Sequence, residues 1–199
     1  MKKIVISWLI CVLGLLALLV WLGYGSSLVK NDTAQEDPSL INGKYSLQSS
    51  TGPVSQKTFK GKYTLVFFGF THCPDICPTT LLLMQNAIRK QEPAVAALIQ
   101  PVFITVDPER DTPKVVGTYV KNFGKNMVGL SGTPAQIKEA ADNFKVYYSK
   151  VEMDDPEMGY MMNHSGFVFL MGPDGQYITH FASNVPEAEL ISGLRKNVR

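Results

Sequence analysis

The 199-residue sequence predicts an α/β domain behind an apolar N-terminal segment. Two apolar runs, residues 63–70 and 101–106, are short enough to be buried parallel strands, and a helix pattern follows each of them. Residues 166–182 contain two β-prone runs on either side of Gly-Pro-Asp-Gly, which is typical of a hairpin turn. Parallel strands with crossover helices, then a hairpin and a last helix, predict a thioredoxin-like fold for residues 41–199.

The remaining elements are short and bounded by turn residues. In chain order we expect a small edge hairpin near residues 45–53, helices at 78–92, 112–124, 133–144 and 186–198, and strands at 127–130 and 146–151. Thr112-Pro113 and Thr133-Pro134 each fit a helix cap followed by proline at the first helical position. An acidic, methionine-rich loop is expected over residues 152–162, and His164 is expected to open the strand that follows.

The N-terminus predicts a transmembrane anchor. Residues 4–22 carry no charge and are long enough to span a bilayer. Lys2 and Lys3 precede them, so the N-terminus is expected in the cytoplasm. We expect residues 1–25 to be a single-pass anchor, with a cleaved signal as the alternative, and residues 26–40 to be a polar tether. No long transit peptide precedes the anchor, so we expect it in a bacterial cytoplasmic membrane with the domain in the periplasm.

Charge and cysteine content exclude two classes of protein. Residues 31–199 contain 16 Lys and Arg and 17 Asp and Glu, a net charge of −1, which argues against a nucleic-acid partner. Of the three cysteines, Cys11 lies in the apolar segment and leaves Cys73 and Cys77 as the only pair. That number is too small for a disulfide-dense secreted scaffold.

Cys73 and Cys77 are the first candidate functional residues. They lie between the first strand and its helix, and a proline follows each of them. Proline suits the first helical position, so we expect a helix from Pro78, a loop over residues 73–77 and Cys77 near the helix cap. The positive end of the helix would then lower the thiol pKa and favour the thiolate, which attacks disulfides and binds metals. Two buried structural cysteines are the alternative, and they rarely occur at such a junction.

His164 is the best candidate among the three histidines. In a thioredoxin-like arrangement the strand that it opens begins against the cysteine loop. Dithiol oxidoreductases of this fold place a cis-proline at that point, whereas this chain has no proline between Pro156 and Pro173. Two thiolates and an imidazole suit copper, with zinc as the competitor.

Two further features could support such a site. Asp107 follows the second strand and could bond to a ligand, although a charged turn with Asp111 near a helix cap is an equal alternative. A methionine cluster before His164 could be a copper-transfer patch or, more commonly, flexible apolar contacts. Its members are Met153, Met158, Met161 and Met162.

Three motifs resemble those of the Sco/SenC family of copper-binding assembly factors for cytochrome c oxidase. They are Phe-Gly-Phe-Thr-His-Cys-Pro-Asp-Ile-Cys-Pro (68–78), Val-Asp-Pro-Glu-Arg-Asp-Thr-Pro (106–113) and His-Ser-Gly-Phe-Val-Phe-Leu (164–170). The resemblance runs from about Lys44 to the C-terminus, and the anchor also matches the family.

The resemblance implies a ligand set and a client. Cys73, Cys77 and His164 would bind one copper ion per domain, as Cu(I) or Cu(II). The family's usual aspartate before the histidine is Asn163 here, which can hydrogen-bond but brings no charge to tune the site. The implied client is subunit II of cytochrome c oxidase or another copper-receiving protein.

The sequence thus predicts a membrane-tethered copper chaperone. The first alternative is a thiol–disulfide oxidoreductase, in which Cys73 and Cys77 are catalytic and reduce the cysteines of the client's copper site. The second is a redox or copper sensor that acts through a partner. Redox chemistry needs only the two sulfurs, whereas copper binding should also need His164.

Overall fold

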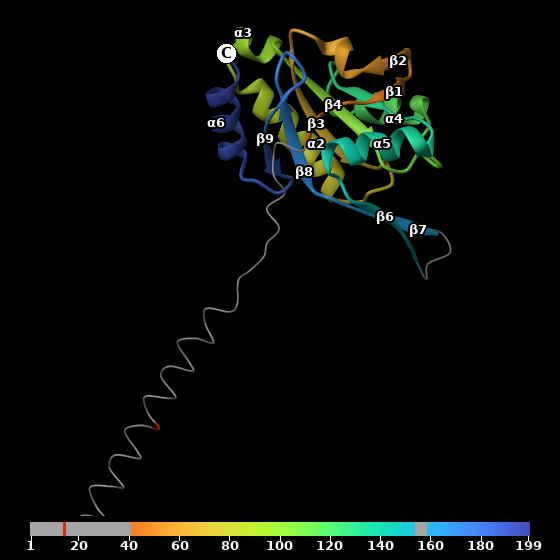
Figure 1. Cartoon of the computed structure of the whole chain (residues 1–199). Coiled ribbons are helices and arrows are strands. Elements are labelled where there is room, and N and C mark those ends of the chain that lie inside the picture. Colours follow the sequence, from red (N-terminus) through yellow and green to blue (C-terminus); the bar gives the residue numbers. More distant parts are fainter. Residues whose placement is uncertain (1–13, 15–40, 154–158) are drawn as a thin grey trace, which may run out of the picture. The chain divides into compact units, whose positions relative to one another are not determined.

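The computed structural model describes residue 14, residues 41–153 and residues 159–199 (Figure 1). The expected anchor and tether lie outside the described residues, apart from Gly14, as does Met158. The described part of the chain includes no helix that is both long and apolar enough to cross a membrane.

Five strands form the central sheet in the order β5-β4-β3-β8-β9. They are β3 (Tyr63–Gly69), β4 (Ile99–Thr105), β5 (Val128–Leu130), β8 (Phe167–Met171) and β9 (Tyr177–Ala182). β3, β4 and β5 are parallel, and the hairpin β8–β9 adds antiparallel strands beside β3. This topology confirms the predicted thioredoxin-like α/β domain.

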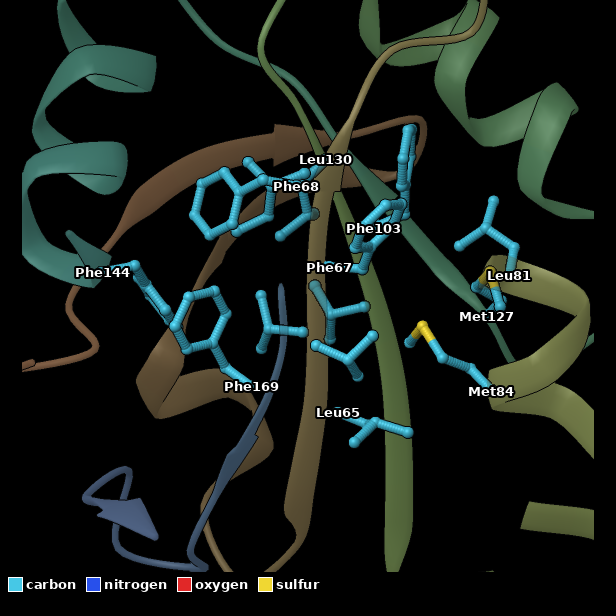
Figure 2. Packing of buried hydrophobic residues seen from close by; sticks show 14 of the residues in the cluster. Leu65, Phe67, Phe68, Leu81, Met84, Phe103, Met127, Leu130, Phe144 and Phe169 are labelled. Carbon is cyan, nitrogen blue, oxygen red and sulfur yellow. The ribbon is translucent and has the colours of Figure 1, made fainter. Parts of the chain in front are cut away.

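Helices cover both faces of the sheet. They are α2 (Ile76–Arg89), α3 (Pro93–Ala97), α4 (Pro113–Val120), α5 (Pro134–Phe144) and α6 (Glu187–Asn197). Successive side chains of β3 alternate between the faces, so Phe68 meets Phe144 of α5 while Phe67 meets Phe103 beneath α2 (Figure 2). Thr112 and Thr133 cap α4 and α5 through their hydroxyls, as their Thr-Pro sequences predict.

A small hairpin confirms the expectation for residues 45–53. It comprises β1 (Ser46–Ser49) and β2 (Gly52–Ser55), and the short helix η2 (Gln56–Phe59) follows. Gln48 of β1 exchanges backbone hydrogen bonds with Ser131 just after β5, which ties the hairpin to the edge of the sheet.

The predicted start of the helix after the cysteines is wrong. α2 begins at Ile76, so Cys77 lies in its first turn and not in a loop before it. Pro78 is tolerated one residue later because the first N–H groups of a helix have no intrahelical partner. α2 also ends at Arg89, earlier than expected, and α3 follows as an additional short helix.

The predicted loop over residues 152–162 is also wrong in part. β7 (Tyr160–His164) pairs antiparallel with β6 (Tyr148–Glu152), and Tyr148 lies opposite His164. His164 therefore ends β7 and does not open β8. Within the described residues, β6 and β7 pair only with each other, as a separate two-stranded sheet beside the five-stranded one.

Candidate functional site

Gly69 allows α2 to begin directly above the end of β3. A Cβ atom at this position would lie 2.7 Å from the sulfur of Cys77 and 2.8 Å from the ring of Phe103. Any larger residue would therefore displace the sulfur or the ring. The close approach leaves Cys77 fully buried, whereas Cys73, in the preceding loop, is partly exposed.

Asp111 fixes the loop that carries the cysteines. Its carboxylate accepts hydrogen bonds from the Thr71 backbone N–H at 2.9 Å, the Thr71 hydroxyl at 2.5 Å and the Thr105 hydroxyl at 2.6 Å. Asp111 lies directly before Thr112, the cap of α4, as the helix-cap interpretation predicts, but it is fully buried and not in a solvated turn. The sequence gives no signal for this role. Thr71 is 40 residues away from Asp111, and Thr105 lies at the end of the preceding strand.

The two thiols have opposite acidities. Both are free, and the Cys77 N–H donates to the Cys73 sulfur at 3.4 Å. The hydrogen bond from the Cys77 side chain, opposed in part by burial, lowers the pKa of Cys73 to about 5. The same hydrogen bond, together with burial, raises the pKa of Cys77 above its ordinary value. The lowered pKa agrees with a thiolate at Cys73, whereas the hydrogen bond with Cys73 and then burial favour the protonated form of Cys77.

His164 presents a ring nitrogen to Cys77. Its Nε2 lies 3.6 Å from the Cys77 sulfur, and its Nδ1 lies 3.1 Å from the backbone oxygen of Ser165. A carbonyl oxygen can only accept, so Nδ1 donates this hydrogen bond and Nε2 is the ring nitrogen that faces the sulfur. The rings of Phe67 and Phe70, at 5.9 and 6.1 Å from the imidazole, restrict its orientation.

Cys73, Cys77 and His164 thus meet at one end of the sheet, from a loop, a helix and a strand. They supply two sulfur donors and one nitrogen donor. Among the described residues, no three His, Cys, Asp or Glu side chains are already arranged to hold a metal ion. The three side chains would have to move closer together to do so, and their role as ligands stays a prediction.

Asp107 and Asn163 lie apart from these three side chains. Asp107, with 2% of its surface exposed, accepts hydrogen bonds from Tyr160 and Arg110 and so is not in a solvated turn. Asn163 is exposed and, as the neighbour of His164 in a strand, points to the opposite face. Among the described residues, neither side chain forms a hydrogen bond with Cys73, Cys77 or His164, so their influence on the site stays a prediction.

The other candidate side chains lie near the site or away from it. His72 is exposed and lies 3.9 Å from Asp111. Met161 and Met162 are on β7 and pack against the core, whereas Met153 is exposed after β6. The proposed methionine patch is therefore divided between a packed strand and an exposed segment.

The sequence matches one protein family and several of its known members. The SCO1/SenC family model matches residues 33–199. A SCO2-like protein of Rickettsia felis is 38% identical over 195 residues, which cover 98% of this chain and 95% of that protein. Protein SCO1 homolog 1, mitochondrial, of Arabidopsis thaliana is 40% identical over 176 residues. That match covers 85% of this chain and 52% of the plant protein, so the chain spans about half of the plant protein's length.

Solved structures agree with the sequence matches. The crystal structure of Arabidopsis thaliana ScoI with copper bound has a TM-score of 0.72 and 40% identity, and the match covers 78% of this chain and 96% of that one. BsSco, described as a member of the Sco family of cytochrome c oxidase assembly proteins with a disulfide switch, has a TM-score of 0.59 and 26% identity. That match covers 82% of this chain and 97% of BsSco. The present chain therefore belongs to the SCO1/SenC family.

Proposed function

We propose that this protein binds copper through Cys73, Cys77 and His164 and delivers it during assembly of cytochrome c oxidase. The observation that carries the proposal is the approach of His164 Nε2 to the Cys77 sulfur, at 3.6 Å, beside the Cys73 thiolate. The two sulfurs come from one loop-helix junction, and the nitrogen comes from a strand 87 residues away in sequence. Redox chemistry at the cysteines would not require that nitrogen.

The donor set fits copper. Thiolate sulfur favours Cu(I), and imidazole nitrogen suits Cu(II), so one site could hold either oxidation state. Structural zinc sites usually have four protein ligands, whereas the described residues bring three such side chains together here. Copper is bound in the related Arabidopsis thaliana ScoI, which supports copper over zinc.

The three proposed ligands differ in whether they must lose a proton before they can bind copper. Cys73, with a pKa of about 5, is a thiolate at neutral pH. Cys77 must release a proton when copper binds, because its hydrogen bond to Cys73 and its burial raise its pKa. His164 already carries its proton on Nδ1, so Nε2 can coordinate without a change of tautomer.

The proposed client is subunit II of cytochrome c oxidase, whose dinuclear copper centre would receive the metal. BsSco, a relative with the same fold, belongs to a family of oxidase assembly proteins, which supports this client. We also propose that residues 1–25 anchor the protein in a bacterial cytoplasmic membrane, residues 26–40 form a tether and residues 41–199 face the periplasm. Protease added to intact spheroplasts should digest the domain, and a protected domain would contradict this topology.

Thiol–disulfide exchange is the second candidate, and the contrast between the two thiols favours it. The Cys73 thiolate would attack a client disulfide and form a mixed disulfide, releasing one client thiolate. Cys77 would then lose its proton and attack Cys73, forming the Cys73–Cys77 disulfide and releasing the second client thiolate. Two electrons pass to the client, which is the reduction that its copper site needs before it is loaded.

Copper stoichiometry tests the first function against the second. We expect the reduced protein to bind one copper ion with sulfur-to-copper charge-transfer absorption in the Cu(II) form. The disulfide form should not bind Cu(I), since it has no thiolate. Equal Cu(I) binding by both forms would contradict the two-thiolate site. A reduced protein that binds no copper while still reducing a disulfide substrate would leave the reductase as the function.

A further inference from the structure

The position of His164 depends on how the β6–β7 hairpin is held. His164 is the last residue of β7, and the hairpin projects from the domain as a separate two-stranded sheet (Figure 1). Main-chain pairing inside the hairpin fixes β7 relative to β6 and not relative to the cysteines. The rings of Phe67 and Phe70 and the packing of Met161 and Met162 hold part of β7, and further contacts between the hairpin and the body of the domain help to fix the distance from His164 to Cys77.

Tyr160, at the other end of β7, makes such a contact through its ring. The guanidinium carbon of Arg110 lies 3.7 Å from the centre of the ring, and the Lys150 ammonium lies 3.8 Å from it. Two cations within 4 Å of one aromatic ring are two cation–π contacts, and the partly buried Arg110 makes the stronger one. Lys150 also pairs with Glu109 at 3.2 Å, so it joins the hairpin to the loop that follows β4.

The polar atoms of Tyr160 bind the same loop. Its hydroxyl donates to Asp107 at 2.8 Å, and its backbone oxygen accepts from Arg110 at 3.0 Å. Arg110 in turn donates to Asp107 at 2.5 Å. Tyr160 therefore contacts the loop through its ring, its hydroxyl and its carbonyl, and the carboxylate that receives its hydroxyl is buried.

Tyr160 and His164 also share a face of β7. Side chains two and four residues apart in a strand point to the same side, so a shift at Tyr160 is transmitted along the strand to His164. A second path runs through Arg110, whose guanidinium carbon lies 6.0 Å from the Phe70 ring centre. Phe70 in turn meets the imidazole edge of His164 at 6.1 Å.

We propose that Tyr160 is a positioning residue that, clamped between Arg110 and Lys150, holds β7 so that His164 stays beside Cys77. This inference deepens the proposed function, because His164 matters for copper only if it is a ligand. Without the clamp the hairpin can move, and the site loses its nitrogen donor while both sulfurs remain. Loss of such a supporting contact typically weakens metal affinity about 10- to 100-fold.

The test compares Tyr160→Leu, Tyr160→Phe and the control Tyr147→Leu in the full-length protein in detergent. Tyr147 precedes the same hairpin, but its side chain is 68% exposed and makes no side-chain hydrogen bond within the described residues. We expect Tyr160→Leu to weaken Cu(II) binding about 10- to 100-fold. Tyr160→Phe keeps the ring for both cations and loses only the hydroxyl, so it should recover most of the affinity. Tyr147→Leu should match the parent.

Amide hydrogen exchange in the copper-free protein gives a readout that does not depend on copper. Residues 160–164 should exchange at least about tenfold faster in Tyr160→Leu, with β8 unchanged. Parent-like exchange in this variant would overturn the inference even if His164 proves not to be a ligand. If His164→Ala weakens Cu(II) binding and Tyr160→Leu does not, the inference fails and the proposed copper site stands.

A global effect of Tyr160→Leu on folding would be visible as fast exchange in β8 as well. In that case Lys150→Met is the variant that tests the inference. It removes one exposed cation from the Tyr160 ring and leaves the hydrogen bond from the Tyr160 hydroxyl to Asp107 intact. It should speed exchange at residues 160–164 several-fold, and exchange equal to the parent would overturn the inference.

Discussion

Replacing Cys77 with alanine should raise the pKa of Cys73. The hydrogen bond from the Cys77 side chain is the largest cause that lowers this pKa from 9.0 to about 5. Backbone N–H groups of Cys77 and Asp75 and the nearby His164 also lower it and remain in the variant. We therefore expect the pKa to rise by roughly two to three units and to stay below the ordinary thiol value.

The assay is alkylation by iodoacetamide as a function of pH, in a Cys11→Ser background so that only the domain thiols can react. The midpoint of the profile reports the pKa of Cys73, because the buried Cys77 reacts slowly. The rate itself is a poorer measure, since a less acidic thiolate is more nucleophilic. Cys77→Ser is the control, and its hydroxyl should restore part of the shift. A midpoint that stays near 5 in Cys77→Ala would refute the role of the hydrogen bond.

Three further predictions concern stability. Gly69→Ala should lower the free energy of unfolding in urea by about 1–3 kcal/mol, because the new Cβ would lie 2.7 Å from the Cys77 sulfur; an unchanged value would contradict the close packing. Asp111→Ala should cost about 3 kcal/mol or more, since the buried hydroxyl of Thr105 and the two partly buried donors of Thr71 lose their acceptor, and a loss below about 1 kcal/mol would argue against that role. The reduced protein should become more stable from pH 5 to about pH 8.5, because unfolded Cys73 binds a proton that the folded thiolate does not. The disulfide form should lack this gain in parallel urea titrations, and identical pH dependence of the two forms would count against the lowered pKa.

Local sequence signals were enough for much of the fold. The helix starts at Thr112 and Thr133 follow from a capping hydroxyl followed by proline, and the structure has both caps. The alternation of buried side chains in β3 and the hairpin around Gly-Pro-Asp-Gly follow from local periodicity and turn chemistry in the same way. The meeting of His164 with Cys77 could be expected only by assuming the fold.

The rest depends on tertiary contacts that no local pattern encodes. Proline disfavours a helical conformation for the residue before it, yet Cys77 is helical in α2, which begins one residue earlier at Ile76, and its sulfur lies close to Gly69. The sequence predicts a loop for residues 160–162 because they do not alternate between apolar and polar, whereas pairing with β6 makes them part of the strand β7. The bonds of Tyr160 to Arg110 span 50 residues, a separation at which sequence spacing gives no information.

The most direct test of the proposed site is the copper affinity of His164→Ala, with His72→Ala as the control. His72 is also next to the cysteines but is exposed, and its ring bonds to Thr71 and not to either sulfur. We predict that His164→Ala weakens copper binding strongly, and Cu(II) more than Cu(I), while Cys73 and Cys77 still form and release their disulfide. His72→Ala should bind copper nearly as the parent does. Unchanged copper affinity in His164→Ala would contradict the two-sulfur, one-nitrogen site and make thiol–disulfide exchange the better account of the protein.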